Sequence, residues 1–352
     1  MSTHVSNSNG VTLQSAFQVG ASVPYLLGFQ PSSSAVLVFS RNINNELVVT
    51  GRLDLPSVED ELEAFCHGCA VTAKSAVEAG ATSVHIVLYP AQDSMDDRSL
   101  MAAVTVVLQD ADLQIEGRGR IEQNMWTDYD RPELSPTSIS EHGSETAFKW
   151  AANGISYVAD RDQLAASVAG PPTPTARAVA EFIDSANGLT TRTVARTASL
   201  RRSTEDAIFG YLTEDLSIDL RDNSPKLPPP DELSRWFLSL PDRRVREPLM
   251  WRLSQRTARD PHTVDRLARL VRNCPFDRAA AIASVLAAHA WQTGNGALAA
   301  IAAKHALDSD PRNVLADLVF RAVTQGVHPR VWEEMLASMT LRDLRSGTVH
   351  HS

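Results

Sequence analysis

Residues 35–53 read AVLVFSRNINNELVVTGRL, and this stretch decides the fold of the front of the chain. Its two ends, 35–39 and 46–53, are rich in apolar and β-branched side chains, which favour β-strands. Asn42, Asn44 and Asn45 lie between them and are typical turn residues. The stretch therefore predicts a β-hairpin.

Segments with helical and strand-like patterns alternate after the hairpin. Helical spacing covers 57–79 and 96–109, and strand-like patterns cover 83–89, 113–125 and 154–158. Strands that alternate with helices form a sheet covered by helices. We therefore expect an α/β or α+β domain with a mixed sheet over residues 13–170.

Two segments at the front have compositions that do not predict regular structure. Residues 1–12 are polar and rich in Ser and Asn, which favours a disordered tail. Residues 131–146 (RPELSPTSISEHGSET) are rich in Pro, Ser and Thr. Such a long connection predicts a flexible loop, either a lid or a disordered insertion.

Helical spacing dominates the rest of the chain, after a Pro-rich boundary at Pro171–Pro174. The helical segments are 176–186, 204–212, 231–240, 245–257, 261–272 and 278–291. A second Pro-rich spacer, 224–230 (SPKLPPP), separates two groups of helices. No convincing strand follows Val158, so we expect an all-helical domain over residues 175–345.

Residues 280–313 match one tetratricopeptide unit in its second half. Gly294 falls at the turn of that unit, Ala299 and Ala306 at its small packing positions, and Pro311 at the helix stop. Ala299 and Ala306 are seven residues apart and share one helical face. The unit does not recur before or after, so it must pack on helices of its own domain. We favour a structural helical hairpin over a peptide-binding groove.

The chain has 352 residues and a net charge of −9, and its charges are unevenly placed. Residues 1–176 hold 9 Lys and Arg against 21 Asp and Glu, whereas 177–352 hold 24 against 21. An acidic first domain repels a phosphate backbone, so a nucleic-acid role would belong to the second. Of the 33 basic residues 29 are Arg, which is typical of a GC-rich genome.

Several features favour a cytoplasmic protein. No apolar run approaches the length that crosses a bilayer, and the start MSTHVSNSNG lacks a signal-peptide pattern. The three cysteines, Cys66, Cys69 and Cys274, form no disulfide framework, which fits a reducing compartment. We expect no membrane association.

The segment Pro24–Pro31 (PYLLGFQP) has the most distinctive local sequence. A turn of small residues with free N–H groups can cradle an anion. The residues of this candidate ligand site are Gly28, Gln30, Ser32, Ser33 and Ser34. The favoured alternative is a structural turn whose apolar residues anchor it to the core.

Two other patterns have a chemical interpretation and a structural one. Cys66 and Cys69 have metal-binding spacing, but zinc needs two further ligands and no second cluster follows. We expect small buried side chains there, with a redox role left open, and neither a metal nor a cofactor.

Arg192 to Arg202 form the densest basic stretch and can contact phosphates. Because Glu205 and Asp206 follow at once, a solvated helix face with local ion pairs is favoured.

Four stretches carry a family resemblance: PYLLGFQP with Ser34, RLDLP at 52–56, DRDQL at 160–164, and AWQTGNGALA at 290–299 through Asp310-Pro311. In these stretches the chain resembles an actinobacterial family of unknown function, numbered four-one-nine-two. This resemblance implies an organisation and a source but no activity. The resemblance also implies a cysteine cluster, which members of that family often have after the strand that corresponds to residues 113–125. This chain has no cysteine between Cys69 and Cys274, so no such site is expected.

Three functional hypotheses follow. The favoured one is a non-catalytic protein-binding or scaffolding protein of an actinobacterium or its phage, which binds a protein partner or self-associates. The alternative is a small-ligand-binding protein or enzyme with a pocket near residues 28–34. The third is nucleic-acid binding through Arg192–Arg202, which the charge balance makes the least favoured. The sequence contains no GxSxG, HExxH, Walker or GxGxxG pattern.

Overall fold

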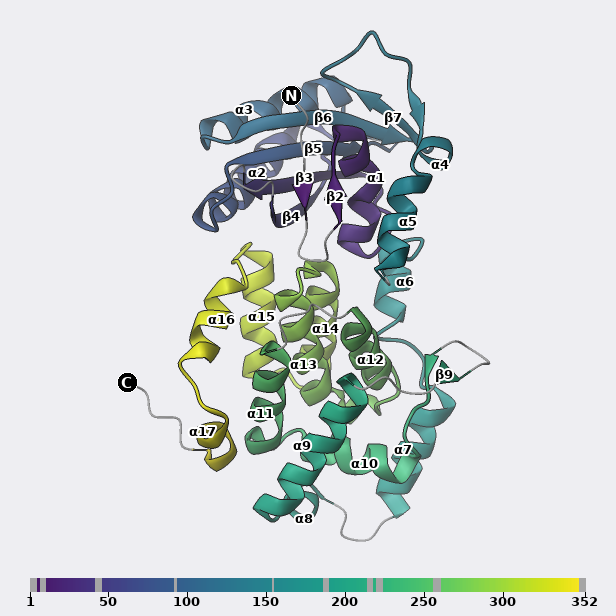
Figure 1. Ribbon diagram of the computed structural model, residues 1–352, viewed down its shortest axis with the longest axis vertical. Coiled ribbons are helices and arrows are strands. Elements are labelled where there is room, and N and C mark those ends of the chain that lie inside the picture. Colours follow the sequence, from purple (N-terminus) through teal and green to yellow (C-terminus); the bar gives the residue numbers. More distant parts are fainter. Residues whose placement is uncertain are drawn as a thin grey trace. The chain divides into compact units, whose positions relative to one another are not determined.

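The protein is described by a computed structural model (Figure 1). The residues described are 5–6, 11–41, 46–91, 94–153, 155–185, 190–213, 218–219, 224–255 and 261–347. The first compact unit comprises Met1–Gln163 and the short segment Thr324–His328, and the second comprises Leu164–Val323 and Pro329–Ser352. The division lies ahead of the expected boundary at Pro171–Pro174. It falls within helix α6 (Arg161–Ala166), whereas the Pro-rich run leads into α7 (Pro174–Ser185).

The first unit is built on a mixed sheet with the strand order β2-β1-β4-β3-β5-β6-β7-β8. The strands are β1 (Val5–Ser6), β2 (Thr12–Leu13), β3 (Ser34–Arg41), β4 (Glu46–Asp54), β5 (Ser83–Tyr89), β6 (Gln114–Glu122), β7 (Met125–Asp128) and β8 (Thr137–Ser138). Strands β3 and β4 are antiparallel: Ser34 pairs with Asp54 at one end, and Arg41 pairs with Glu46 at the other. This confirms the predicted hairpin. Most of the expected tail lies outside the described residues, but β1 pairs with β2 and β4.

The order of the central strands follows from their connections. β3 pairs with β5 antiparallel, while β5 and β6 are parallel. Parallel neighbours need a crossover, and α3 (Asp97–Asp110) supplies it. The Asp96 side chain caps α3 by accepting a hydrogen bond from the Ser99 backbone N–H at 2.9 Å. The expected α/β character of this unit is confirmed.

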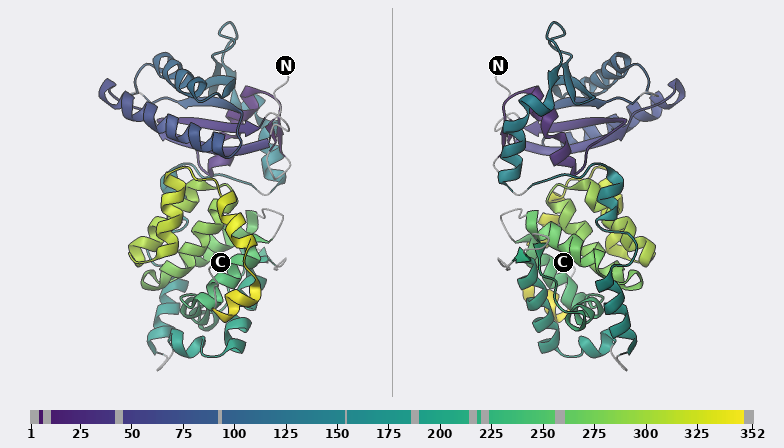
Figure 2. Two further views of the ribbon diagram at one scale, coloured as in Figure 1. Left: turned by 90° about the vertical axis from the view of Figure 1, so that its left-hand side faces the viewer. Right: turned by 90° about the vertical axis from the view of Figure 1, so that its right-hand side faces the viewer.

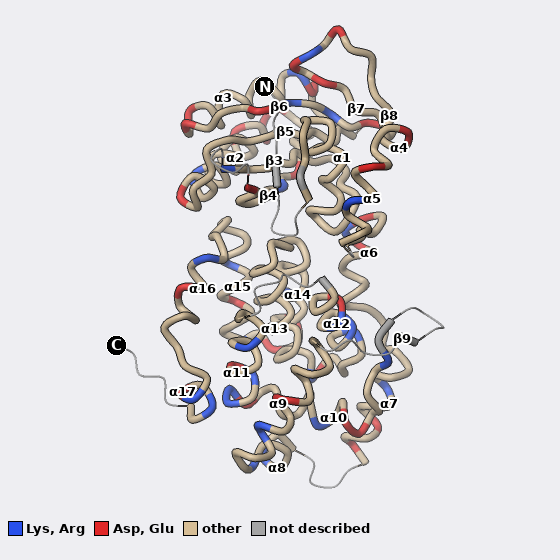
Figure 3. The backbone as a smooth tube through the Cα atoms, in the orientation of Figure 1, with Lys and Arg blue, Asp and Glu red and all other residues tan. Residues whose placement is uncertain are grey.

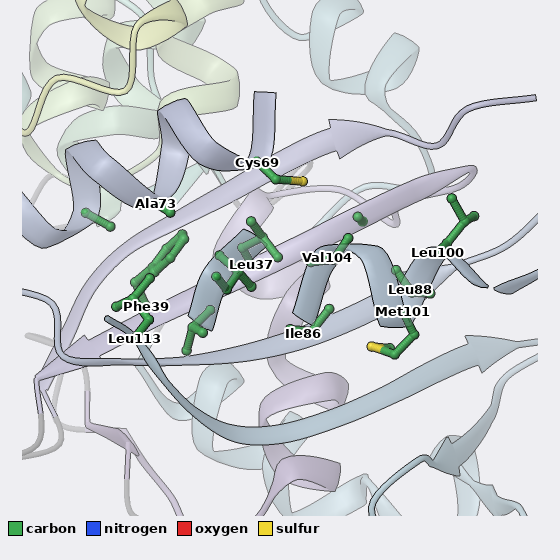
Figure 4. Close-up of a cluster of buried hydrophobic side chains, with 14 of the residues drawn as sticks. Leu37, Phe39, Cys69, Ala73, Ile86, Leu88, Leu100, Met101, Val104 and Leu113 are labelled. Atoms are coloured by element: carbon green, nitrogen blue, oxygen red, sulfur yellow. The ribbon is translucent and has the colours of Figure 1, made fainter. Parts of the chain in front are cut away.

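The main apolar core lies between one face of the sheet and two helices, α2 (Leu62–Glu78) and α3 (Figure 4). A short 3-10 turn, η1 (Glu59–Glu61), precedes α2. Alternate residues of β3 and β5 point into this core, as strand geometry requires. The strand members are Ala35, Leu37, Phe39, Val84, Ile86 and Leu88. Cys69 and Ala73 of α2 pack on them, because small side chains let the helix approach the sheet.

The opposite face is covered by α1 (Ala16–Leu27), which packs on β5, β6 and β7. The sequence pattern did not predict this helix, because Pro24 lies inside it. A proline removes the N–H that would bond the carbonyl four residues earlier. The Gly20 carbonyl accepts a hydrogen bond from the Tyr89 hydroxyl at 3.4 Å instead. A tertiary contact thus stabilises a helix that local propensity disfavours.

The segment 113–125, expected to be one strand, holds β6 and the start of β7. Gln123 and Asn124 have φ angles of 48° and 65°, so both occupy the left-handed region. A pair of left-handed residues is the two-residue turn that suits a hairpin. The expectation was wrong because Gln-Asn is a weaker turn signal than Asn-Gly.

Residues 131–146 contain more regular structure than a flexible loop. They include β8, α4 (Ile139–His142) and the start of α5 (Ser144–Ala152). Ser138 caps α4 through a hydrogen bond from the Glu141 N–H at 3.4 Å. The Ser and Thr residues that favoured a loop are also good helix caps. The expected strand at 154–158 is reduced to one bridge between Phe29 and Val158, and Gly154 lies outside the described residues.

Replacing Gly117 with alanine will lower the free energy of unfolding by about 2 kcal/mol. A Cβ at this position of β6 would lie 2.6 Å from the Ala16 Cβ and 3.1 Å from the His85 ring, so α1 would have to shift. Urea denaturation measures the change. As a control, Gly296→Ala adds a Cβ with its nearest neighbour at 3.7 Å and will leave stability within about 0.5 kcal/mol of the parent. Equal effects of the two changes would contradict the close approach of α1 and β6.

The second unit is mostly helical (Figure 2). Its remaining elements are α8 (Thr191–Val194), α9 (Ala198–Thr213), β9 (Ile218–Asp219), β10 (Ser224–Pro225), α10 (Pro230–Ser239), α11 (Arg243–Ser254), α12 (Pro261–Arg272), η2 (Phe276–Arg278), α13 (Ala279–Gln292), α14 (Gly296–Ser309), α15 (Val314–Thr324), α16 (Arg330–Ala337) and α17 (Leu341–Ser346). The antiparallel pair β9–β10 is one departure from the expected all-helical domain. The end of the Pro-rich spacer starts α10, since proline fits the first turn of a helix.

Helix α13 is the centre of this unit. It packs against α10, α11, α12, α14 and α16, and Figure 1 shows it enclosed by helices. All but one of its residues, Ala280, are buried. A helix that is apolar on all sides is typical of such a central position. Of the described part of the chain, no helix combines the length and apolar character needed to span a membrane.

Candidate functional site

Gly28 ends α1 in a left-handed conformation with φ of 80°. Its N–H donates to the Pro24 carbonyl at 2.8 Å. A residue without a Cβ is the usual solution for such a helix end. The glycine that marked the candidate ligand site therefore has a structural role as a helix cap.

The residues after Gly28 pair with a distant segment of the first unit. The Val158 N–H donates to the Gly28 carbonyl at 3.0 Å, and the Gln30 N–H donates to the Val158 carbonyl at 3.0 Å. These bonds form the bridge between Phe29 and Val158. The backbone N–H of Gln30 is thus already bonded and does not contribute to an anion-binding nest.

The three serines that follow differ in exposure. Ser34 is buried, and its hydroxyl donates to the Ser32 carbonyl at 2.5 Å. Ser33 has a φ of 41°, and its carbonyl accepts from the Leu55 N–H at 2.9 Å. Ser32 is exposed. Most polar groups of this candidate site therefore already bond to the chain itself, which leaves few of them for a ligand. A ligand site at Gly28, Gln30 and Ser32–Ser34 stays a prediction.

The hydrogen bonds of the Gly28–Ser34 connection do not favour ligand binding, but its position in the sheet does. Ser34 begins β3 and pairs with Asp54 at the end of β4 and with Tyr89 at the end of β5. The connection therefore lies at the edge where β4, β5 and β6 have their carboxyl ends. In sheets with parallel strands, ligands bind outside this edge.

A polar cluster that the sequence analysis missed lies at the same edge. The Tyr129 hydroxyl and the Arg120 guanidinium both donate to Asp97 Oδ2 at 2.6 Å. Burial raises the pKa of Tyr129 well above its ordinary value, and its hydrogen bond to Asp97 adds to this. No local spacing relates Asp97 to its two partners, which lie 23 and 32 positions later in the sequence.

This cluster and the Gly28–Ser34 connection do not form one site. Arg120 pairs with Leu88, whose side chain points into the core under α2 and α3. Ser34 pairs with Tyr89, which contacts α1 on the other face. The sheet separates the two sets. The edge therefore offers two small polar regions rather than one catalytic constellation.

An aromatic cluster surrounds the end of α1. The ring of Tyr25 stacks on Trp150 at 5.6 Å and meets Tyr157 edge-on at 4.8 Å. Trp150 is buried and donates its Nε1–H to the Ser22 hydroxyl at 2.9 Å. Tyr157 is exposed. These contacts fasten α5 to α1 and leave one aromatic ring at the surface near Gly28.

The two cysteines of α2 are small side chains in or near the core. Burial raises the pKa of Cys69 to about 12 and also raises the pKa of Cys66. A thiol in this state is a poor nucleophile at neutral pH. Within the described ranges, no three His, Cys, Asp or Glu side chains gather in a metal-binding arrangement.

The residues of the predicted tetratricopeptide-like unit form the pair α13 and α14. Ala299 and Ala306 are fully buried, as their small packing positions require. However, α13 is enclosed by other helices, so the face that could line a groove is filled. This agrees with the structural interpretation of the hairpin, while its tetratricopeptide character stays a prediction.

The Arg192–Arg202 stretch forms α8, a turn and the start of α9. Arg201 donates to the Ala195 carbonyl at 2.8 Å and so fastens this turn. Arg192, Arg196 and Arg202 are exposed. Glu205 and Asp206 do pair with arginines, but among the described residues their partners are Arg252 and Arg345 rather than arginines of this stretch. The local ion pairs expected from the sequence are therefore long-range ones.

Taken together, these features define a protein with an α/β unit, whose sheet edge carries small polar regions, followed by a mostly helical unit. The chain belongs to the family described as Domain of unknown function (DUF4192), whose profile matches residues 18–330. The family resemblance seen in the sequence is confirmed. No curated protein and no solved structure matches the chain.

Proposed function

We propose that the protein is a binding or scaffolding protein that recognises a protein partner through its helical unit. The observation that carries the proposal is a set of exposed apolar side chains on α15 and α16. Val314 and Leu318 are 78% and 46% exposed, and Val331 and Met335 are 59% and 41% exposed. Residues four apart lie on one face of a helix, so each helix has an apolar outer row.

These rows differ from the normal surface of an amphipathic helix. The buried faces of the same helices are already apolar, with Ala316 and Val319 on α15 and Trp332 and Leu336 on α16. A surface helix usually carries polar side chains on its outer face. Single exposed apolar residues are common, whereas repeated ones are typical of an interface. The proposal follows from the pattern on both successive helices.

The source and location of the protein belong to the same proposal. The three cysteines are free, which supports a reducing compartment and therefore the cytoplasm. The sequence resemblance and the Arg-rich composition support an actinobacterium or its phage as the source.

Affinity capture with the full chain will recover a specific partner, and Leu318→Lys with Met335→Lys will lose at least about nine-tenths of it. A lysine in each row buries a charge in the expected interface. Val106→Lys is the control, because Val106 is an exposed apolar residue of α3 in the other unit. Quantitative mass spectrometry of the captured proteins measures the loss.

Two outcomes would contradict the proposal. One is recovery of no specific partner by the parent chain, together with a monomeric mass in light scattering, since a second copy is the other occupant that fits. The other is equal retention of the partner by the parent and the double variant. Circular dichroism of the variant ensures that the helices remain folded.

A further inference from the structure

A second surface of the helical unit is basic and lies on other helices than α15 and α16. We call it the basic surface and define it by arginines on α8, on α9 and the turn before it, on α11, and on α17. Its members are Arg192, Arg196, Arg202, Arg243, Arg244 and Arg342. Blue segments mark these elements in Figure 3.

Three of the helices that carry these arginines, α9, α11 and α17, are joined by direct contacts. α11 packs against both α9 and α17. Arg345 of α17 bonds Glu205 of α9 at 2.8 Å, and a Cβ on Gly347 would lie 3.4 Å from the Arg244 side chain. The α8–α9 turn is held to the start of α9 by Arg201. The elements that carry the arginines therefore adjoin one another in space, although about 150 residues of sequence separate the first arginine from the last.

Three of the acidic residues beside these arginines are withdrawn from the surface, and a fourth, Asp206 of α9, is 54% exposed but pairs with Arg252. Glu205 is fully buried between Arg252 and Arg345. The side chain of Asp242 is 12% exposed and pairs with Arg244. Glu247 is partly buried and pairs with Arg243. Because three of these carboxylates are withdrawn and Asp206 is paired with Arg252, the outer layer is more positive than the composition of the segment indicates.

Four of these arginines differ from other basic residues of the helical unit in having no carboxylate partner among the described residues. Lys304, Arg321 and Arg330 each pair with an acid one helical turn away. In contrast, Arg192, Arg196, Arg202 and Arg342 form no ion pair with any residue that the structure describes. An exposed guanidinium without a carboxylate partner is available to bind phosphate in a two-pronged geometry.

We propose that the basic surface binds the phosphate backbone of double-stranded DNA without sequence preference. Single strands are usually bound through aromatic side chains that stack on bases. Phe209 lies on α9, the helix that carries Arg202, and its ring is covered by the Arg252 guanidinium at 3.8 Å from the ring centre. Exposed arginines beside a covered ring suit contacts with phosphates rather than stacking on bases.

The overall charge of −9 does not prevent this contact. Charges more than about 8 Å apart are largely screened at physiological salt. The field at the surface is therefore set by the nearby arginines. The acidic residues of the first half of the chain lower the long-range attraction and so favour weak binding that depends strongly on salt.

The test is fluorescence anisotropy of the full chain with a labelled DNA duplex of mixed sequence, over a salt series that starts at about 50 mM. The parent will bind, and the triple variant Arg192→Gln, Arg196→Gln, Arg202→Gln will bind at least about tenfold more weakly. Its slope of log affinity against log salt will be smaller by about 2 to 3, since each lost phosphate contact removes about 0.9. Arg342→Gln alone will reduce the slope by about 1.

The matched control is Lys304→Gln, Arg321→Gln, Arg330→Gln, which removes the same number of charges from positions that have acidic partners. It will keep the affinity of the parent within about twofold. Three results would each overturn the proposal: no binding by the parent at the lowest salt, an equal loss in the control, or competition by polyglutamate at the same charge concentration as DNA. The last result would assign the surface to an acidic protein. Matching melting temperatures of the variants exclude unfolding as the cause.

Discussion

Replacing Glu205 with alanine will lower the free energy of unfolding of the helical unit by about 3 to 4 kcal/mol. The Glu205 side chain is fully buried and accepts hydrogen bonds from Arg252 at 3.0 Å and from Arg345 at 2.8 and 2.9 Å. Arg252 and Arg345 are themselves only 21% and 23% exposed. Removing the carboxylate leaves two partly buried positive charges side by side. Urea denaturation followed by circular dichroism measures the loss.

The neighbouring residue is a matched control for this change. Asp206 also pairs with Arg252, at 2.6 Å, but its side chain is 54% exposed. Exposed ion pairs contribute little, so Asp206→Ala will cost less than about 1 kcal/mol. If the two variants lose the same stability, Glu205 does not hold α9, α11 and α17 together, and the contiguity of the basic surface loses its structural basis.

Acid will destabilise the first unit through His85, by about 3 kcal/mol between pH 7 and pH 4. The His85 side chain lies in the sheet under α1 with 1% exposure, and neither ring nitrogen has a hydrogen-bond partner among the residues that the structure describes. Burial lowers the pKa of His85 from 6.5 to about 4, although the charge of Asp130 opposes this. The unfolded chain therefore takes up a proton at a higher pH than the folded one. Stability is complete above pH 6.5 and is lost as the pH falls towards 4.

The variant His85→Leu tests this assignment. It removes the titrating group and two unpaired polar atoms, so the drop in unfolding free energy between pH 7 and pH 4 will shrink by about 3 kcal/mol. Acidic residues contribute to acid unfolding in both proteins, and the comparison cancels them. His67→Gln, at an exposed position of α2, will leave the drop as it is in the parent. An unchanged drop in His85→Leu would rule out His85 as the source.

The sequence predicted elements whose patterns are local. The hairpin of β3 and β4, the helices α2 and α3, and α12 over residues 261–272 follow from periodicity and end signals. It failed where a distant contact decides the structure. Helix α1 contains Pro24 and is stabilised by Tyr89, and the turn at Gln123–Asn124 closes on strands that the sheet itself aligns.

The candidate sites divide in the same way. Local sequence marked Gly28 as unusual, but only the structure shows that it caps α1 and that its carbonyl bonds Val158. Local sequence also found the arginines from 192 to 202. It could not find Arg342, whose helix folding joins to α9 through the Arg345–Glu205 pair, or the burial of the Glu205 carboxylate beneath the surface arginines.

By itself, the sequence determined the family, the order of an α/β part and a helical part, and the uneven charge, because these depend on motifs, periodicity and composition along the chain. Only the tertiary structure decided which charges face water, which face of the helical hairpin is filled, and which residues share the carboxyl edge of the sheet. The physical reason is that burial and pairing are set by neighbours far apart in sequence, and these determine both the pKa of His85 and the surface that a partner meets.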